Sequence, residues 1–218
     1  MGGRTDERMV TIPLRAPEEG ALEGVFQAGA LDEGQGCVIA PPHPLYGGSM
    51  DSPVASELAY AAVRAGIAAL RFNWRGVGAS AGIASGEPRD ADADYAAALA
   101  HLGATVAGRL VACGYSFGAA AALRAARLHP RIGRGLLVAP PPSLVEAGAL
   151  RELERPALVL VGSADRIAPH DALAADVAAA PGARLELIAD ADHFFMSGLA
   201  ELGRRAHAWL AQGTARGR

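Results

Sequence analysis

Residues 110–118 read Leu-Val-Ala-Cys-Gly-Tyr-Ser-Phe-Gly, an apolar run that ends in a G-x-S-x-G pattern. An alanine-rich segment of helical composition follows directly. Glycines two residues before and after Ser116 allow a strand and a helix to approach closely through a sharp turn. The pattern therefore predicts that Ser116 lies at the end of a buried strand, with its hydroxyl projecting from the edge of a sheet.

Short apolar runs alternate with helical patterns on both sides of this turn. Strands are predicted at 36–41, 67–74, 110–114, 135–139, 157–161 and 184–189. Helices are predicted near 51–65, 90–103, 116–129, 171–180 and 201–210. Continuous apolar strands separated by helices are typical of an α/β fold, with a mostly parallel sheet covered on both faces. Two earlier runs, 9–14 and 21–28, flank a polar turn at 16–20 and predict an antiparallel hairpin at one edge.

The composition is that of a globular chain. Of 218 residues, 51% are hydrophobic and 20% are charged, which excludes a disordered or collagen-like protein and predicts a single domain over residues 1–218. The net charge of −3 gives no electrostatic reason to expect nucleic acid or an anionic membrane as a partner. Every basic residue is arginine, so a lysine nucleophile or Schiff base is excluded.

The N-terminal ten residues carry several charges and lack the apolar segment of a secretory signal. No run approaches the ~18 uncharged apolar residues that a membrane-spanning helix needs. The two cysteines, Cys37 and Cys113, lie in apolar runs and are interpreted as small buried side chains and not as metal ligands. These features predict a cytoplasmic protein without a metal site or cofactor.

A serine hydroxyl becomes a strong nucleophile only with an adjacent base, which in turn is held by an acid. In folds that carry this turn, the acid and the base follow in chain order, each after a later strand. Asp165 is the first acidic residue after the run 157–161, and His193 follows the run 184–189. Because the carboxyl ends of parallel strands meet at one edge of the sheet, these two residues are predicted to form a catalytic triad with Ser116.

Other acidic and histidine residues are interpreted differently. Asp171 is expected to cap the helix that follows it. Asp190 and Asp192 are expected to be solvated, since they could orient His193 only if the chain bent back. Four more histidines are expected on the surface, at helix ends or on helix faces: His101, His129, His170 and His207.

A tetrahedral intermediate needs hydrogen-bond donors aimed at its oxyanion. The amide of Phe117, at the N-terminus of the helix, is the first predicted donor. The second is expected from the loop 41–48, in which Pro44 has no N–H; Leu45 is the first candidate and Tyr46 the second. His43 is expected mainly to fix this loop through hydrogen bonds. Nearby side chains are candidates to line the substrate pocket: His43, Tyr46, Tyr115 and Phe194.

The stretch 75–82 reads Arg-Gly-Val-Gly-Ala-Ser-Ala-Gly and superficially resembles a dinucleotide-binding loop. Its third glycine is displaced by one position, and it follows the fourth predicted strand instead of opening a strand–helix–strand unit. A tight turn is the preferred interpretation. Arg75 is expected to pin this loop by pairing with Glu87 or Asp90.

Taken together, these features resemble the α/β-hydrolase superfamily from the first hairpin to the last helix. The blocks Pro-His-Pro-Leu-Tyr-Gly-Gly-Ser-Met-Asp at 42–51 and Arg-Phe-Asn-Trp-Arg-Gly-Val-Gly at 71–78, followed by Glu87 and Asp90, are similar to a subgroup of small bacterial hydrolases. This subgroup is akin to dienelactone hydrolases and to serine esterases without a cap. The resemblance implies an eight-stranded sheet and the same triad, with serine in place of the cysteine of dienelactone hydrolases.

In this superfamily a lid is commonly inserted between the sixth and seventh strands, and here only residues 140–156, with a short helical stretch near Leu150, separate them. The sequence therefore predicts an open site without a substantial lid, suited to short acyl esters or to a protruding part of a larger substrate. Hydrolysis of a small-molecule carboxylic ester is the predicted activity.

Two alternatives stay open. One is a peptidase or acyltransferase that uses the same triad, and the other is a non-catalytic binding protein on the same fold. An apolar patch expected near Leu144, Val145 and Leu150 makes a homodimer a candidate assembly.

Overall fold

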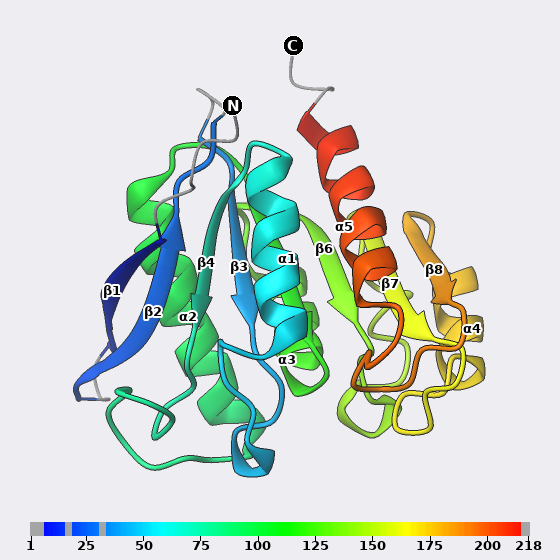
Figure 1. The fold of residues 1–218 in the computed structure, drawn as a ribbon, viewed down its shortest axis with the longest axis horizontal. Helices are drawn as coiled ribbons and strands as arrows, with labels where there is room; N and C mark the ends of the chain where they lie inside the picture. The colour runs from blue at the N-terminus through cyan, green and yellow to red at the C-terminus, as the bar shows by residue number, and fades with distance from the viewer. Residues whose placement is uncertain (1–6, 16–18, 31–33, 215–218) are drawn as a thin grey trace.

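The sheet contains eight strands in the order β1-β2-β4-β3-β5-β6-β7-β8 (Figure 1). The computed structural model describes residues 7–15, 19–30 and 34–214. Its strands are β1 (Glu7–Pro13), β2 (Ala21–Gln27), β3 (Gly36–Ala40), β4 (Ala68–Phe72), β5 (Leu110–Tyr115), β6 (Ile132–Val138), β7 (Ala157–Gly162) and β8 (Ala183–Ile188).

The first two strands form the predicted antiparallel hairpin, although part of its turn, residues 16–18, lies outside the described residues. Strand β2 joins β4 antiparallel, and every pairing from β4 through β8 is parallel. The predicted α/β fold with a mostly parallel, eight-stranded sheet is therefore confirmed. The carboxyl ends of these parallel strands all lie at the lower edge in Figure 1.

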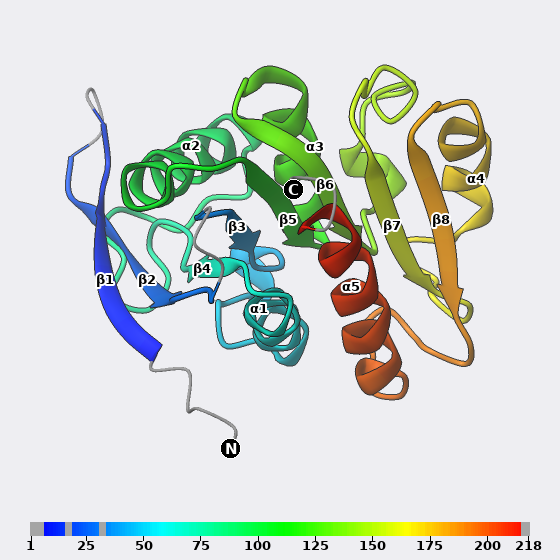
Figure 2. The same cartoon turned by 90° about the horizontal axis from the view of Figure 1, so that it is seen from above.

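Helices cover both faces of the sheet (Figure 2). Helices α1 (Pro53–Arg64) and α5 (Leu199–Thr214) lie on one face. Helices α2 (Pro88–Thr105), α3 (Phe117–Leu128) and α4 (Asp171–Ala178) lie on the other. Two apolar cores result, one on each face, and the large side chains at their centres, such as Leu58 and Leu99, are at most 2% exposed. Burial of each such side chain stabilises the fold by about 1.5–3 kcal/mol.

Helix starts follow the local signals in the sequence. In α1 the Ser52 hydroxyl accepts a hydrogen bond from the Ala55 amide at 3.2 Å, and Pro53 occupies the first turn, where its missing N–H costs nothing. Helix α2 likewise begins at Pro88. Helix α3 begins directly after Ser116, so its N-terminus lies at the carboxyl edge of the sheet.

The connection between β6 and β7 is short, as predicted, and contains only a 3₁₀ turn, η2 (Pro142–Leu144), followed by further turns. The helical stretch predicted near Leu150 is a series of turns instead. The prediction of an exposed apolar patch is also wrong at Leu150, which is 0% exposed and belongs to the same core as the buried residues of α3. Leu144 and Val145 are partly buried against the same core.

Cys37 on β3 and Cys113 on β5 are free and fully buried, as predicted. Among the helices of the described residues, none combines the length and the hydrophobicity needed to cross a membrane.

Candidate active site

The turn from β5 into α3 places Ser116 in a conformation that L-residues rarely adopt, with φ of +55°. A Cβ atom on Gly114 would collide with the carbonyl of Gly118, and one on Gly118 would collide with the carbonyl of Ala40. Both glycines of the motif are therefore required by close backbone contacts. The predicted sharp turn is confirmed, and its strain is of the kind that concentrates at functional sites.

Three loops at the carboxyl edge bring Ser116, His193 and Asp165 together. The Ser116 Oγ atom lies 3.0 Å from His193 Nε2, and His193 Nδ1 lies 2.8 Å from Asp165 Oδ2. The three side chains follow β5, β8 and β7, and each residue is between 6% and 7% exposed. A hydroxyl, an imidazole and a carboxylate thus form one continuous hydrogen-bonded chain.

The second oxygen of Asp165 is held by its own loop. Asp165 Oδ1 accepts hydrogen bonds from the amides of Ile167 and Ala168, each at 2.8 Å. Burial by itself would raise the pKa of Asp165, but the hydrogen bonds from His193 and from these two amides outweigh it, and the pKa is lowered. Asp165 is therefore a stable anion at neutral pH, able to fix the imidazole and to stabilise its protonated form.

Tyr115 supports the histidine loop. Its hydroxyl donates a hydrogen bond to the carbonyl oxygen of His193 at 2.8 Å, and the residue is only 4% exposed. As a candidate for lining the pocket, Tyr115 is therefore placed differently from expectation, because its side chain is buried beside the imidazole. Phe194 is 62% exposed, and its ring meets that of His193 edge-on, with centroids 5.6 Å apart.

The His193 imidazole is hydrogen-bonded to Ser116 and Asp165, and the other acidic residues near it in sequence have different positions. Asp190 is exposed, and Asp192 accepts a hydrogen bond from the Met196 amide. Asp171 is the first residue of α4 and not its cap, a position that His170 occupies. The four histidines expected on the surface are partly exposed, on helices or at their ends: His101, His129, His170 and His207.

Phe117 is the first residue of α3, and the amides of a helix's first turn have no partner within the helix. The loop after β3 lies nearby, since the ring of His43 packs on that of Phe117 with centroids 4.6 Å apart. In this loop the Leu45 amide donates to His43 Nδ1 at 3.2 Å, and the Tyr46 amide donates to the His43 carbonyl at 3.1 Å. The two candidate donors of this loop, the Leu45 and Tyr46 amides, are thus both hydrogen-bonded to His43.

His43 caps the short 3₁₀ turn η1 (Pro44–Tyr46), which agrees with the structural role expected for it. Burial lowers the pKa of His43, so the imidazole is neutral at pH 7 and its Nδ1 is free to accept the Leu45 amide. Tyr46 is 86% exposed and packs its ring 4.6 Å from that of His43, between centroids. For Leu45 to bind an oxyanion, its N–H must exchange His43 Nδ1 for the substrate oxygen.

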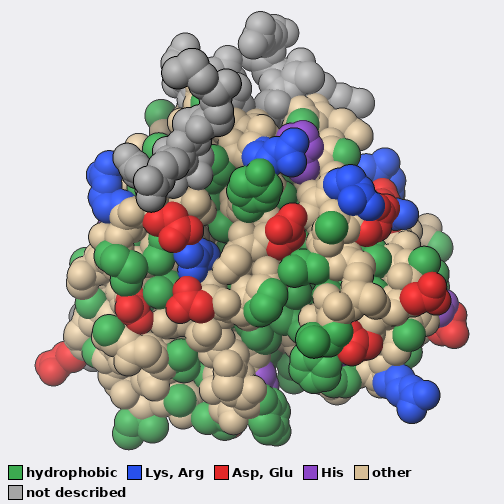
Figure 3. All heavy atoms as spheres, in the orientation of Figure 1, with side chains coloured by type: hydrophobic (Ala, Val, Ile, Leu, Met, Phe, Trp, Pro, Cys, Tyr) green, Lys and Arg blue, Asp and Glu red, His purple; other side chains and the backbone are tan. Residues whose placement is uncertain are grey.

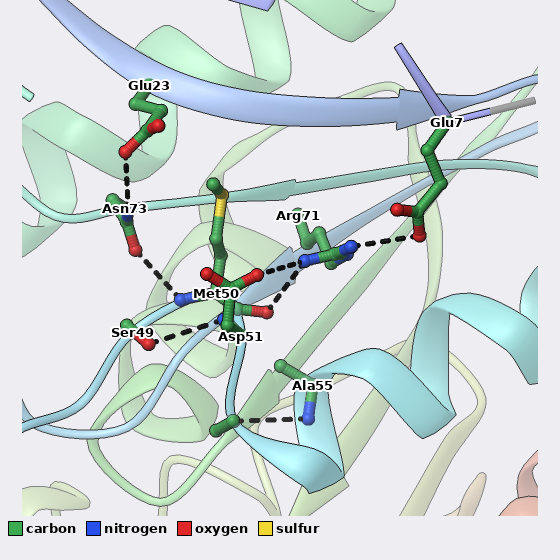
Figure 4. Close-up of polar contacts among 9 residues, drawn as sticks. Glu7, Glu23, Ser49, Met50, Asp51, Ala55, Arg71 and Asn73 are labelled. Carbon is green, nitrogen blue, oxygen red and sulfur yellow. Dashed lines mark hydrogen bonds and ion pairs between the residues drawn. The ribbon is translucent and has the colours of Figure 1, made fainter. Parts of the chain in front are cut away.

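Residues that sequence reasoning missed hold the far end of this loop (Figure 4). Asn73 Oδ1 accepts a hydrogen bond from the Met50 amide at 2.8 Å. Arg71 donates to the Met50 carbonyl at 3.2 Å and to Asp51 at 2.7 Å, and it also pairs with Glu7 at 2.9 Å. The sequence signal for these residues was an arginine and an asparagine within an otherwise apolar predicted strand.

The loop after β4 is pinned by Arg75, as predicted, but chiefly to a different acid. Arg75 binds Asp94 through its backbone amide and its guanidinium, at 2.8–3.0 Å, and it also reaches Asp90 at 3.2 Å. Glu87 is instead the N-cap residue of α2. Burial raises the pKa of Asp94, and the bonds from Arg75 oppose that shift.

Exposed hydrophobic side chains lie at the same edge of the sheet as the site. Six of them, each at least 50% exposed, lie on the loops at the carboxyl edge: Leu45, Tyr46, Ile83, Ile167, Phe194 and Met196. Figure 3 shows hydrophobic side chains gathered along this lower edge, with a histidine among them. Within the described residues, no cluster of three or more His, Cys, Asp or Glu side chains is placed to hold a metal ion.

No protein-family model matches the chain. An uncharacterized protein of Rickettsia prowazekii is 29% identical over 167 residues, which is 75% of this chain and 70% of that protein.

Solved structures resemble the whole fold. A candidate α/β hydrolase of unknown function from Agrobacterium tumefaciens has a TM-score of 0.85 at 26% identity, covering 96% of this chain and 98% of that one. An α/β serine hydrolase homologue from Coxiella burnetii has a TM-score of 0.82 at 27% identity, covering 97% and 100%. A serine hydrolase without a lid from Xanthomonas campestris has a TM-score of 0.78 at 28% identity, covering 98% and 95%.

Proposed function

We propose that this chain, which has the α/β-hydrolase fold and is similar to α/β hydrolases of which one is described as lacking a lid, hydrolyses carboxylic esters with short acyl chains. Ser116 is the proposed nucleophile, His193 the base and Asp165 the acid that orients it. The observation that carries this proposal is the unbroken chain of hydrogen bonds from the Ser116 hydroxyl through His193 to Asp165.

The reaction proceeds through an acyl-enzyme. Ser116 Oγ attacks the ester carbonyl carbon while its proton passes to His193 Nε2. The tetrahedral intermediate collapses, and the leaving alcohol takes the proton from His193. Water then attacks the acyl-enzyme, gives its proton to His193 and releases the carboxylic acid, after which His193 returns the proton to Ser116. Asp165 stays ionised throughout and stabilises the imidazolium.

The amides of Phe117 and Leu45 are the proposed oxyanion donors. The Phe117 amide opens α3, so the positive end of the helix dipole adds to its hydrogen bond. Leu45 supplies its N–H by releasing His43 Nδ1 when the substrate oxygen arrives. One such donor contributes about 10²–10³-fold to turnover.

Hydrolysis is favoured over acyl transfer because the site is open. A transferase must keep water from the acyl-enzyme, whereas here the connection between β6 and β7 is only a set of turns and the surrounding side chains are exposed. Water therefore has access to the acyl-enzyme. This openness supports a small ester, or an ester at the end of a larger molecule, as the substrate.

The test compares Ser116→Ala with the wild type on p-nitrophenyl acetate and with a fluorophosphonate probe. The variant should lose about 10⁴-fold or more in kcat/KM and should not be labelled. The matched control is Ser56→Ala, which makes the same change within α1 and should keep full activity and labelling. Equal labelling of the wild type and Ser116→Ala would overturn the proposed mechanism.

A further inference from the structure

A groove of about 200 Å³ opens beside the N-terminus of α3. Helix α3 contributes Phe117, Ala120 and Arg124, three residues that share one face because they are three and seven positions apart. The other wall consists of Pro88 at the start of α2 and of residues 143–146 in the connection between β6 and β7. The groove thus begins at the residue that follows Ser116.

The part of the groove nearest to Ser116 is apolar. Phe117 and Ala120 are 3% and 2% exposed and form its floor, while Leu144 and Val145 are partly buried at its side. Pro88 completes this part without offering a backbone N–H. Such a surface favours a hydrocarbon group over a polar one, because each methylene removed from water strengthens binding by about fourfold.

The far end of the groove carries charges that are already paired. Arg124 donates to both oxygens of Asp92, at 2.8 and 3.1 Å. Glu146 accepts a hydrogen bond from Arg127 at 2.9 Å. A charged ligand would have to break one of these pairs, whereas an uncharged chain would simply stop against them. The groove therefore fits an uncharged apolar chain of limited length.

Building on the ester hydrolysis proposed above, we propose that this groove binds the acyl chain of the substrate and sets its maximum length. Phe117, whose amide is the proposed oxyanion donor, also lines the groove, so the groove starts one residue along the chain from the proposed nucleophile. The groove extends along α3 from position 117 to position 124, which is about 10 Å at 1.5 Å per residue.

An extended hydrocarbon advances about 1.25 Å per carbon, because its bonds of about 1.5 Å are staggered. Acyl chains of up to about eight carbons therefore fit before the Arg124–Asp92 pair blocks them. Within the series of p-nitrophenyl esters, kcat/KM should rise from acetate to octanoate and then fall for dodecanoate.

The test fills the groove with Ala120→Leu. This variant should lower the ratio of kcat/KM for octanoate to kcat/KM for acetate by about tenfold or more, because three added carbons occupy the chain's position. The matched control is Ala96→Leu, the same change at an exposed position of α2 outside the groove, and it should follow the wild type across the whole series. A second variant, Arg124→Ala, removes the block at the far end and should increase kcat/KM for dodecanoate relative to octanoate.

Each outcome separates this inference from the function on which it rests. If Ala120→Leu and Arg124→Ala both keep the wild-type chain-length profile while Ser116→Ala is inactive, the groove is not the acyl site and the hydrolase proposal stands. If the wild type hydrolyses none of the esters, the hydrolase proposal itself fails. If size-exclusion chromatography shows a wild-type dimer that Ala120→Leu converts to a monomer, a second copy of the chain occupies the groove and the inference is overturned.

Discussion

Two sides of the carboxyl edge are held in place in different ways. On the side that carries the acid, the Asp165 carboxylate is oriented by its own turn, since it accepts hydrogen bonds from amides only two and three residues further along the chain. On the other side, the loop after β3 is held at Met50 by Asn73 and Arg71, which lie more than 20 residues away in sequence. The Asp165 carboxylate is thus oriented by a local turn, whereas Met50 is held by side chains far away in sequence.

The contacts that hold Met50 differ in strength. Arg71 is 7% exposed in its side chain, but its partners Glu7 and Asp51 are 53% and 71% exposed, so solvent weakens both ion pairs. The buried hydrogen bonds to the Met50 backbone hold the loop more strongly than these two ion pairs do. Arg71 Nε is buried without a hydrogen-bond partner among the described residues, which reduces the stability that these contacts provide.

The largest effect is expected on the locally held side, for Asp165→Asn. An amide in place of the carboxylate favours the wrong imidazole tautomer and cannot stabilise the imidazolium, so kcat should fall by about 10⁴-fold. The matched control is Asp192→Asn, next to His193 in sequence but hydrogen-bonded to the Met196 amide, which should change kcat by less than about threefold. Steady-state kinetics on p-nitrophenyl acetate decide the matter, and equal losses in the two variants would remove Asp165 from the mechanism.

The same division explains what the sequence could predict. The strand before Ser116, the glycines around it and the acidic residue after the next-but-one strand are local patterns, and each has a direct structural meaning. Strand β6 begins at Ile132, three residues before its predicted start, which was placed too late because Gly133 and Arg134 interrupt the apolar run. Arg134 is accommodated by hydrogen bonds to the Trp209 and Leu210 carbonyls of α5, which no local pattern indicates.

Side-chain direction was the other limit. Tyr115 is adjacent to Ser116 in sequence, but successive residues of a strand point to opposite faces, and its side chain is buried beneath the histidine loop. Asp94 lies one helical turn after Asp90 on the same face of α2, so the two acids were equivalent as partners for Arg75 until the helix was placed against the loop.

A smaller effect is expected on the side held by long-range contacts, for Asn73→Leu. The variant leaves the buried Met50 amide without an acceptor, which should lower the free energy of unfolding by about 1–3 kcal/mol. Because the loop that carries Leu45 is then less firmly placed, kcat should fall by about tenfold with little change in KM. Urea denaturation and steady-state kinetics measure the two quantities.

Ser80→Ala is the control for the hydrogen bonds around Asn73. Ser80 donates to the Asn73 carbonyl and accepts from the Glu23 amide, so its loss weakens the same network without removing a bond to the loop after β3. It should lower stability but keep kcat within about twofold. If Asn73→Leu also lowered stability alone, the network would be a support of the fold and not of the site.

The smallest expected effect is a pH dependence of stability that compares His43, in the loop after β3, with His129, outside the site. Each imidazole accepts, through Nδ1, an amide two residues later, and burial is the first cause that lowers the pKa of each. A lowered pKa means that the unfolded chain binds more protons just below pH 6.5, so the stability each histidine provides is complete above that pH and declines as pH falls.

Urea denaturation at pH 7 and pH 5 should therefore show a smaller loss of stability in His43→Asn and in His129→Asn than in the wild type, since asparagine accepts the same amide without titrating. The lowered pKa of Asp165 acts only below its ordinary value of 3.8 and does not enter this range. The two substitutions should reduce the loss of stability additively, because the two histidines share no hydrogen-bond partner. At pH 7, only His43→Asn should also change kcat relative to the wild type, since only His43 holds the amide that the oxyanion needs. An equal change of kcat in His129→Asn would separate the Leu45 amide from catalysis.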